Sequence, residues 1–407
     1  MKNGTDRRNI LKGLFALPAF VVLGSKAEWG TAEGNPLANA LGTDLAGRVE
    51  GSPAGRALVM VHLAGGNDGL NTVVPIGDPA YARLRPALAL SKADVLPIDR
   101  GLALHPALGG FKTLYERGQL AIVQGVGYPN PDFSHFRATE IWEAGDPNGG
   151  SSGWIGRYLD ETPARRGLRA VALSKEQPPL VLASSSSPAV TVSDTASFRP
   201  PANADAIRAM YAAYAKQPAA RHVVGEAGVE TLNAASTISS LRGGSGVNYP
   251  PGELSADLRR AAELLAAGVG IEVLHLSFGG FDTHVNQTGK HRQLLNQLGG
   301  AFAAFQQDLE RRGIAKNVAT VVYSEFGRRP AENFGGGTDH GSAGPLFVIA
   351  NGVRGGLHGE TPSLTALDNG NLRFTTDFRA VFGGIVRDCL KGDPSAVFRG
   401  IAPLGLF

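Results

Sequence analysis

Residues 271–287 have the sequence IEVLHLSFGGFDTHVNQ, in which a strand-like apolar run is followed by two glycines and the triplet Asp282-Thr283-His284. Asp282 and His284 are two positions apart, so in extended backbone both side chains point to the same side. A carboxylate and an imidazole that converge at the end of a strand can bind a divalent metal. The same triplet could instead form a polar turn that caps the helical pattern after it.

Other apolar runs are typical of strands buried on both faces, the clearest being ALVMVHL at residues 57–63. We expect His62, inside that run, to be a core histidine. Further runs occur at residues 119–127, 318–324 and 346–350. Because these runs alternate with helical patterns, they indicate an α/β core with a largely parallel sheet.

The pattern loosens between about residues 143 and 254, where Gly/Ser-rich turns separate weak helical stretches. We therefore expect one α/β domain over residues 55–407, with a mainly helical and irregular cap-like insertion at 143–254. Residues 28–54 are rich in Gly, Ala and small polar residues, which predicts a linker.

The first 27 residues resemble a twin-arginine export signal, because Arg7-Arg8 precedes a short apolar run at 13–24. The run is too short for a transmembrane helix and contains Pro18, so we expect a removed signal rather than a stable membrane anchor. This predicts the twin-arginine export machinery as a partner and a periplasmic or secreted location.

The net charge of +3 comes from this leader, which holds five basic residues and one acidic residue. The rest of the chain has 34 basic and 35 acidic residues, so nothing favours a nucleic-acid-binding surface. The single cysteine, Cys389, excludes an intrachain disulfide, which suits a protein exported in its folded state.

Polar residues with catalytic or metal-binding chemistry follow the predicted strands. They are Asn67 and Asp68, Ser134 and Arg137, Asp282 and His284, Glu325 and Arg328, and Asp339 and His340. The carboxyl ends of parallel strands meet at one sheet edge, where ligands bind, so we expect these residues to lie close together.

Simpler interpretations exist for some of these residues. Asn67-Asp68-Gly69 also fits an ordinary turn, and it stays open whether Asn67 or Asp68 points inward. Ser134 fits a helix N-cap. It would equally fit a nucleophile beside free N–H groups at a helix start, with Arg137 clamping an oxyanion.

Several motifs together resemble the exported bacterial family called domain of unknown function 1501, over roughly residues 54–390. The motifs are residues 65–69 (GGNDG), 134–138 (SHFRA), 280–284 (GFDTH), 325–328 (EFGR) and 339–341 (DHG). That family is similar to the alkaline phosphatase and sulfatase superfamily. The resemblance implies a three-layer α/β/α sandwich with a mostly parallel sheet and a metal site at the strand ends.

Carried over by position, the resemblance implies that Asp68 binds one metal and that Ser134 is the nucleophile. It implies a second ligand set of Asp282, His284 and His340, with Asp339 as a further metal ligand. Glu325 stands where the superfamily usually has an Asp-His pair, so that metal site would be weaker or would prefer a harder ion. We therefore expect one or two divalent ions, either Zn or one of Mg, Mn and Ca.

The implied function is metal-dependent hydrolysis of a phosphate or sulfate ester, in a small molecule or a polymer. Arg137 or Arg328 would neutralise the oxygens of the transferred group. The residues around Ser134 do not resemble the pattern of sulfatases that oxidise their nucleophile. The alternative is a non-catalytic, metal-containing binding or assembly protein of the same fold. A third hypothesis, a carbohydrate-active or peptidoglycan-associated enzyme, rests only on the expected location of the protein.

Overall fold

The computed structural model describes residues 56–162, 168–185, 187, 189–193, 199–218, 220–240 and 244–407. The predicted signal at residues 1–27 and the linker at 28–54 lie outside these ranges. Across the described ranges, no helix combines the length and the apolar character needed to cross a membrane.

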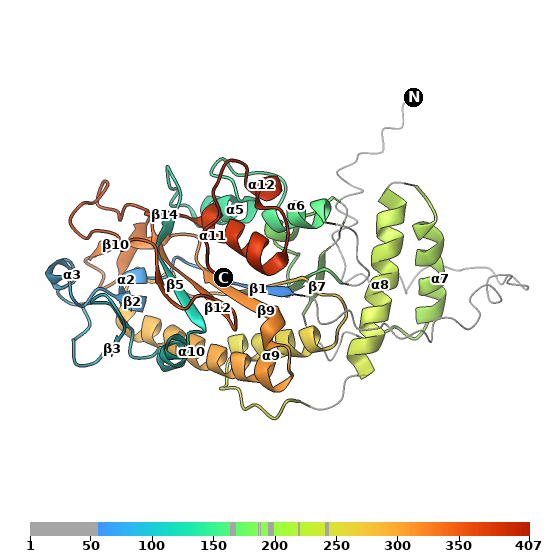
Figure 1. Cartoon of the computed structure of the whole chain (residues 1–407), viewed down its shortest axis with the longest axis horizontal. Coiled ribbons are helices and arrows are strands. Elements are labelled where there is room, and N and C mark those ends of the chain that lie inside the picture. The colour runs from blue at the N-terminus through green and yellow to red at the C-terminus, as the bar shows by residue number, and fades with distance from the viewer. Residues whose placement is uncertain are drawn as a thin grey trace, which may run out of the picture.

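The core is a nine-stranded, mostly parallel sheet (Figure 1). Along the sheet the strands are β13 (Gly356–His358), β5 (Leu120–Gly127), β12 (Gly344–Ala350), β9 (Val318–Tyr323), β1 (Ala57–Leu63), β8 (Val273–Phe278), β6 (Ala170–Leu173) and β7 (Ala189–Val192), with β14 (Thr376–Asp377) also paired to β5. Every pairing is parallel except those of β12, which runs antiparallel to both β5 and β9.

Helices cover both faces of the sheet and give the expected three-layer α/β/α sandwich (Figure 1). All seven residues of β1 are buried, because successive side chains point to opposite faces and both faces are covered. Val59 and Val61 pack in one apolar cluster with Phe302 of α10. Leu58 and Met60 pack in another cluster, on the side of α5, α6 and α11.

The helices have the following bounds. They are α2 (Gly69–Thr72), α3 (Pro79–Leu84), α4 (Gly109–Glu116), α5 (His135–Ala144), α6 (Trp154–Glu161), α7 (Ala204–Ala215), α8 (Ala220–Ser240), α9 (Glu253–Ala266), α10 (Gln287–Arg311), α11 (Phe378–Ile385) and α12 (Pro394–Val397). Shorter turns are η1 (Leu180–Leu182), η2 (Ala315–Asn317) and the π-helical η3 (Val386–Leu390).

The antiparallel strand β12 decides how Asp339 and His340 reach the sheet edge. They precede β12 instead of following a strand, and they lie on β11 (Thr338–Gly341), which pairs with β10 (Gly327–Glu332) in a separate ribbon. Because β12 runs opposite to its neighbours, the chain that enters it lies at the edge where β1, β8 and β9 end. A small sheet of β2 (Val73–Val74), β4 (Ala103–Leu104) and β3 (Leu96–Pro97) completes the strands.

The range 143–254 differs from the expected cap-like insertion. Its strands β6 and β7 extend the central sheet, with β6 paired to β8 in parallel. Helices α7 and α8 pack against each other beyond the β7 edge, at the opposite end of the molecule from β10 (Figure 1). The weak sequence pattern therefore contains two short strands, of which β6 is buried and β7 is mostly half-buried, and its helical pair does not cover the edge where β1 and β8 end.

Candidate metal centre

The loop after β8 carries Asp282 and His284 and lies against the loop after β1. Phe281 is fully buried, and its N–H donates to the carbonyl of Ala64 at 3.2 Å. Gly65 has a φ of +117°, and a Cβ at this position would overlap the backbone nitrogen of Asp282. Only glycine permits both the conformation and the close approach, so Gly65 places one loop directly on the other.

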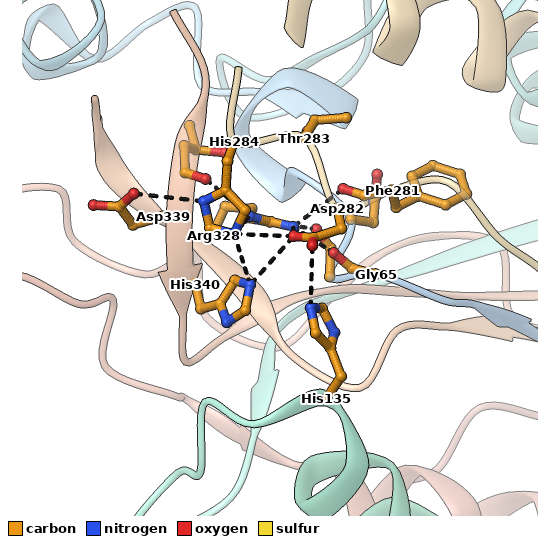
Figure 2. A network of polar contacts seen from close by, with 12 residues as sticks. Gly65, His135, Phe281, Asp282, Thr283, His284, Arg328, Asp339 and His340 are labelled. Carbon is orange, nitrogen blue, oxygen red and sulfur yellow. Dashed lines mark hydrogen bonds and ion pairs between the residues drawn. The ribbon is translucent and has the colours of Figure 1, made fainter. Parts of the chain in front are cut away.

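Four side chains converge on the carboxylate of Asp282 (Figure 2). Its Oδ1 lies 2.7 Å from Arg328 Nη2, 3.0 Å from His284 Nε2 and 3.2 Å from His340 Nε2. Its Oδ2 lies 3.5 Å from Nε2 of His135, which comes from the first turn of α5. Burial raises the pKa of Asp282, but the hydrogen bond and the positive charge of Arg328 oppose it, and the pKa is lowered to about 2. The carboxylate is therefore ionised at neutral pH.

Two of the imidazoles are held by oxygens on the far side of the ring. His340 Nδ1 lies 2.7 Å from the carbonyl oxygen of Phe133, and His135 Nδ1 lies 2.7 Å from Oε1 of Glu325. A carbonyl and an ionised carboxylate only accept hydrogen bonds, so both Nδ1 atoms must carry the proton. In the neutral ring each Nε2 then has a free lone pair, which points toward Asp282.

The third imidazole, that of His284, is arranged in a similar way. Its Nδ1 lies 3.6 Å from Oδ1 of Asp339, which is held by the side-chain amide of Asn333 at 3.0 Å. A carboxylate behind a histidine fixes the ring and strengthens it as a metal ligand. Asp339 thus sits behind His284, in contact with the ring rather than with Asp282.

The donor set fits a divalent cation. Bond lengths of about 2.0 Å in a tetrahedral site put ligand atoms about 3.3 Å apart. The Nε2 atoms of His284 and His340 lie 2.9 Å apart, and the three Nε2 atoms lie 3.0 to 3.5 Å from the carboxylate oxygens of Asp282. Nε2 of His135 is buried and makes no hydrogen bond within the described residues. His135, Asp282 and His340 also form the group of metal-type side chains found in the part of the chain that the structure describes.

Glu325 supports His135 from behind. Its Oε1 accepts from His135 and from the N–H of Gly65 at 2.8 Å, and its Oε2 lies 2.9 Å from Nε2 of His62. Burial raises the pKa of Glu325, but the hydrogen bonds from His135 and His62 hold it well below its usual range. Glu325, predicted as a ligand, therefore lies behind His135 and hydrogen-bonds to its ring, and the core histidine His62 contacts its other carboxylate oxygen.

Arg328 is almost fully buried and holds the loops of the site together. Its guanidinium donates to carbonyl oxygens of Gly65, Gly66, Phe281 and Thr338, as well as to Asp282. These acceptors belong to the loops after β1 and β8 and to the β11 strand. The contacts fit a positioning residue that fixes Asp282, which differs from the substrate-facing role expected from the sequence.

Ser134 and Arg137 flank His135 on the surface of α5. Ser134 is the exposed N-cap residue, and its hydroxyl makes no capping hydrogen bond. Its N–H donates to Asp132 at 2.7 Å, which fixes the turn that aims His135 inward. Arg137 pairs with Glu140 at 2.7 Å, along the outer face of the helix.

Asp68 and Asn67 belong to a second, fully buried polar network. Asp68 pairs with Arg85 at 2.6 Å and accepts from the amide of Gln287. Burial raises the pKa of Asp68, but the Arg85 charge outweighs it and the pKa is lowered. Asn67 Oδ1 lies 3.0 Å from Nε2 of His291. Both residues thus lie at the end of β1 as expected, but their partners lie outside the Asp282 cluster.

Of the predicted residues, the structure brings together Asp282, His284, Arg328, Asp339 and His340, with Glu325 one layer behind. His135 joins them and was not predicted, although it stands next to Ser134 in the motif. The sequence feature that could have identified His135 is an imidazole at the start of a helix that follows a strand. Which of the two neighbours points inward depends on the helix phase, and that is set by the turn at Asp132.

A family model described as "Protein of unknown function (DUF1501)" matches residues 121–378 of the chain. A search of curated proteins finds no match. Among solved structures, the C-terminal periplasmic domain of EcEptC from Escherichia coli in complex with Zn has 10% identity and a TM-score of 0.37, covering 74% of this chain and 74% of that one.

Two further structures are similar at the same low level. The PsFucS1 sulfatase from Pseudoalteromonas sp. has 11% identity and a TM-score of 0.34, covering 76% of this chain and 66% of that one. The phosphonate monoester hydrolase of Agrobacterium radiobacter has 8% identity and a TM-score of 0.28, covering 72% of this chain and 68% of that one. At these scores the structures carry no weight for the site, whose interpretation rests on its geometry.

Proposed function

Because the chain belongs to the DUF1501 family, whose description assigns no activity, we propose its function from the site: a divalent-metal-dependent hydrolase of phosphate or sulfate esters. One observation carries the proposal. Three imidazole Nε2 atoms converge on one ionised carboxylate, and the rings of His135 and His340 have their Nδ1 protons tied to oxygens on the far side. Such a set of lone pairs is built for a cation.

We assign Asp282, His284, His340 and His135 as the residues that hold the ion. Imidazoles suit Zn²⁺ and similar metals, whereas Mg²⁺ and Ca²⁺ prefer sets made of oxygens. We therefore favour Zn²⁺ over Mg²⁺, Mn²⁺ or Ca²⁺. We also favour one ion over two, because Asp68 and Glu325 are already paired with Arg85 and with two histidines.

When bound, such an ion polarises the ester oxygen and supplies ionised water near neutral pH. The chain's own residues hold the ligands in place. Arg328 keeps Asp282 oriented, and Glu325 keeps the Nδ1 proton of His135 in place. Ser134 remains a candidate nucleophile, since its exposed hydroxyl is uncommitted to the helix cap and lies next to His135.

The test is metal analysis of protein purified without chelator, together with turnover of aryl phosphates and aryl sulfates. We expect close to one Zn²⁺ per chain, and loss of both metal and turnover in Asp282→Ala. A metal-free wild-type protein with no zinc affinity would overturn the proposal. So would an Asp282→Ala variant that hydrolyses esters at the wild-type rate.

The contacts of Arg328 favour a second candidate, a non-catalytic metal-containing binding or assembly protein. A buried guanidinium 2.7 Å from Asp282 already compensates part of the charge of that carboxylate, and Arg137 faces Glu140. This candidate predicts retained zinc with no turnover of any ester in the panel, and unfolding of the chain on chelation.

We further propose export through the twin-arginine route to the periplasm or the exterior, from the residues 1–27 that lie outside the described ranges. The test replaces Arg7 and Arg8 by lysine together and follows the protein by cell fractionation. Retention of the double variant inside the cell, with release of the wild type, is the expected result. Equal release of both would contradict it.

A further inference from the structure

Exposed apolar side chains lie close in sequence to the residues of the Asp282 cluster. The structure describes seven large apolar residues that are exposed; four of them lie in segments that carry the cluster, and a fifth, Phe374, lies at the end of β5. The five are Phe133 (37% exposed), Phe136 (91%), Val285 (64%), Phe334 (113%) and Phe374 (37%), and we call them the apolar rim. The other two, Met210 and Tyr214, lie on α7.

Each side of the cluster contributes to the apolar rim. Phe133 provides the carbonyl that binds His340, and Phe136 follows His135 on α5. Phe374 packs at the end of β5, with its Cβ 2.9 Å from where a Cβ on Gly127 would lie. Phe133 and Phe136 therefore stand at the start of α5, and Phe374 stands at the end of β5.

The remaining members stand on the side of His284. Val285 is the next residue along, and Phe334 is at the tip of the β10–β11 ribbon. The two segments touch, because the N–H of Asn286 donates to the carbonyl of Gly335 at 3.1 Å and a Cβ on Gly335 would lie 2.9 Å from Val285 Cγ1. Exposed apolar side chains thus stand next in sequence to His135 and His284, at the tip of the β10–β11 ribbon that carries His340, and at the end of β5.

Exposed aromatic side chains gathered in one place indicate a binding surface. A small hydrophilic ester would fill the polar centre and leave the apolar rim in water. A folded protein partner seated on the rim would close off the centre. A molecule with an anionic head and an apolar chain satisfies both parts, because the head meets the cation site and the chain covers the aromatic rings.

We propose that this site takes amphiphilic substrates, namely phosphate or sulfate monoesters of long-chain alcohols, with the head at Asp282 and the chain on the apolar rim. The inference rests on the proposed function for its chemistry. Burial of a methylene group strengthens binding by up to about fourfold, so chain length should control kcat/KM.

The experiment compares ethyl, hexyl and decyl phosphates and the matching sulfates with zinc-loaded enzyme, below the concentrations at which they form micelles. We expect kcat/KM to rise at least about tenfold from ethyl to decyl for the preferred head group. Phe136→Ser and Phe334→Ser should reduce this ratio. The matched controls Met210→Ser and Tyr214→Ser, on α7, should keep it.

Binding of ethyl- and decylphosphonate, measured by calorimetry, separates this inference from the proposed function. If no ester is hydrolysed, the proposed function fails, while tail-dependent phosphonate binding lost in Phe136→Ser still supports the amphiphile. Equal kcat/KM and equal binding for short and long chains would overturn the inference and leave the hydrolase standing. Equal binding of an uncharged detergent with the same chain would also overturn it, because the head would then play no part.

Discussion

The Nε2 atoms of His284 and His340 lie 2.9 Å apart. The Nδ1 proton of His340 is committed to the carbonyl of Phe133, so its Nε2 has a lone pair and cannot donate to His284 while the ring is neutral. Two imidazole nitrogens and the Asp282 carboxylate therefore meet around one point. A divalent ion bound at that point would accept the lone pairs of these groups together.

His340→Ala tests this relationship most directly. Removing a carboxylate behind a histidine already weakens metal binding by about 10–100-fold, so losing the imidazole itself should cost more. We expect zinc affinity, measured by competition with a chromogenic chelator, to fall by more than about 100-fold. His358→Ala is the control, since His358 lies on β13 and contacts the carbonyl of Arg354. Equal zinc affinity in both variants would contradict the assignment.

Glu325→Gln addresses the layer behind the ligands. The amide keeps the shape but weakens the acceptor that holds the Nδ1 proton of His135, so zinc affinity should fall by about 10–100-fold while the fold is retained. Glu272→Gln is the matched control, because Glu272 is also a buried carboxylate and pairs with Arg169 at 2.7 Å. It should lower the free energy of unfolding and leave zinc affinity unchanged. If Glu325→Gln instead lowered the free energy of unfolding and left zinc affinity unchanged, Glu325 would have only a structural role.

Arg85→Met should destabilise the protein severely. Arg85 and Asp68 are both fully buried and 2.6 Å apart, so the change leaves an ionised carboxylate without its partner. Breaking such a pair costs about 3–5 kcal/mol. Urea unfolding monitored by circular dichroism measures it. Arg208→Met, which breaks the exposed pair with Asp205, should have a far smaller effect. Similar losses in both variants would contradict the role given to burial.

Much of the fold follows from local pattern. The run at 57–63 is apolar throughout because helices cover both faces of the sheet, so its position as β1 could be predicted from the sequence. The placement of Asp282 and His284 at the sheet edge also followed, from the rule that parallel strand ends share an edge, whereas His340 reaches that edge because it precedes the antiparallel strand β12. In contrast, β6 and β7 are four residues each, too short to give a periodic signal against their Gly- and Ser-rich surroundings.

The parts of the site that were not predicted depend on orientation. Ser134 and His135 are adjacent, and only the turn fixed by Asp132 decides that the imidazole points inward. Asp68 ends β1 as expected, but its direction is set by Arg85, a residue that no motif marks. Such choices are made by tertiary packing and charge pairing, which a single sequence does not display.

The buried histidines predict loss of stability in mild acid. Burial lowers the pKa of His275 to about 3 and the pKa values of His105 and His291 to about 4. An unfolded histidine binds a proton below about pH 6.5. Between about pH 6.5 and 4 the unfolded chain therefore holds more protons than the native one. As the pH is lowered through this range, the free energy of unfolding should decrease by up to about 1.4 kcal/mol per pH unit for each histidine.

His275→Gln isolates one of these contributions, away from the metal centre. Urea unfolding at several values between pH 6.5 and 4.5 should give a dependence on pH that is shallower by about 1.4 kcal/mol per unit than in the wild type, because one proton no longer binds on unfolding. His222→Gln is the control, since it removes an imidazole that is exposed on α8. Carboxylates that titrate at the lower end contribute equally to all three proteins and cancel in the comparison. Parallel slopes for wild type and His275→Gln would mean that His275 gains its proton as readily in the native state as in the unfolded chain.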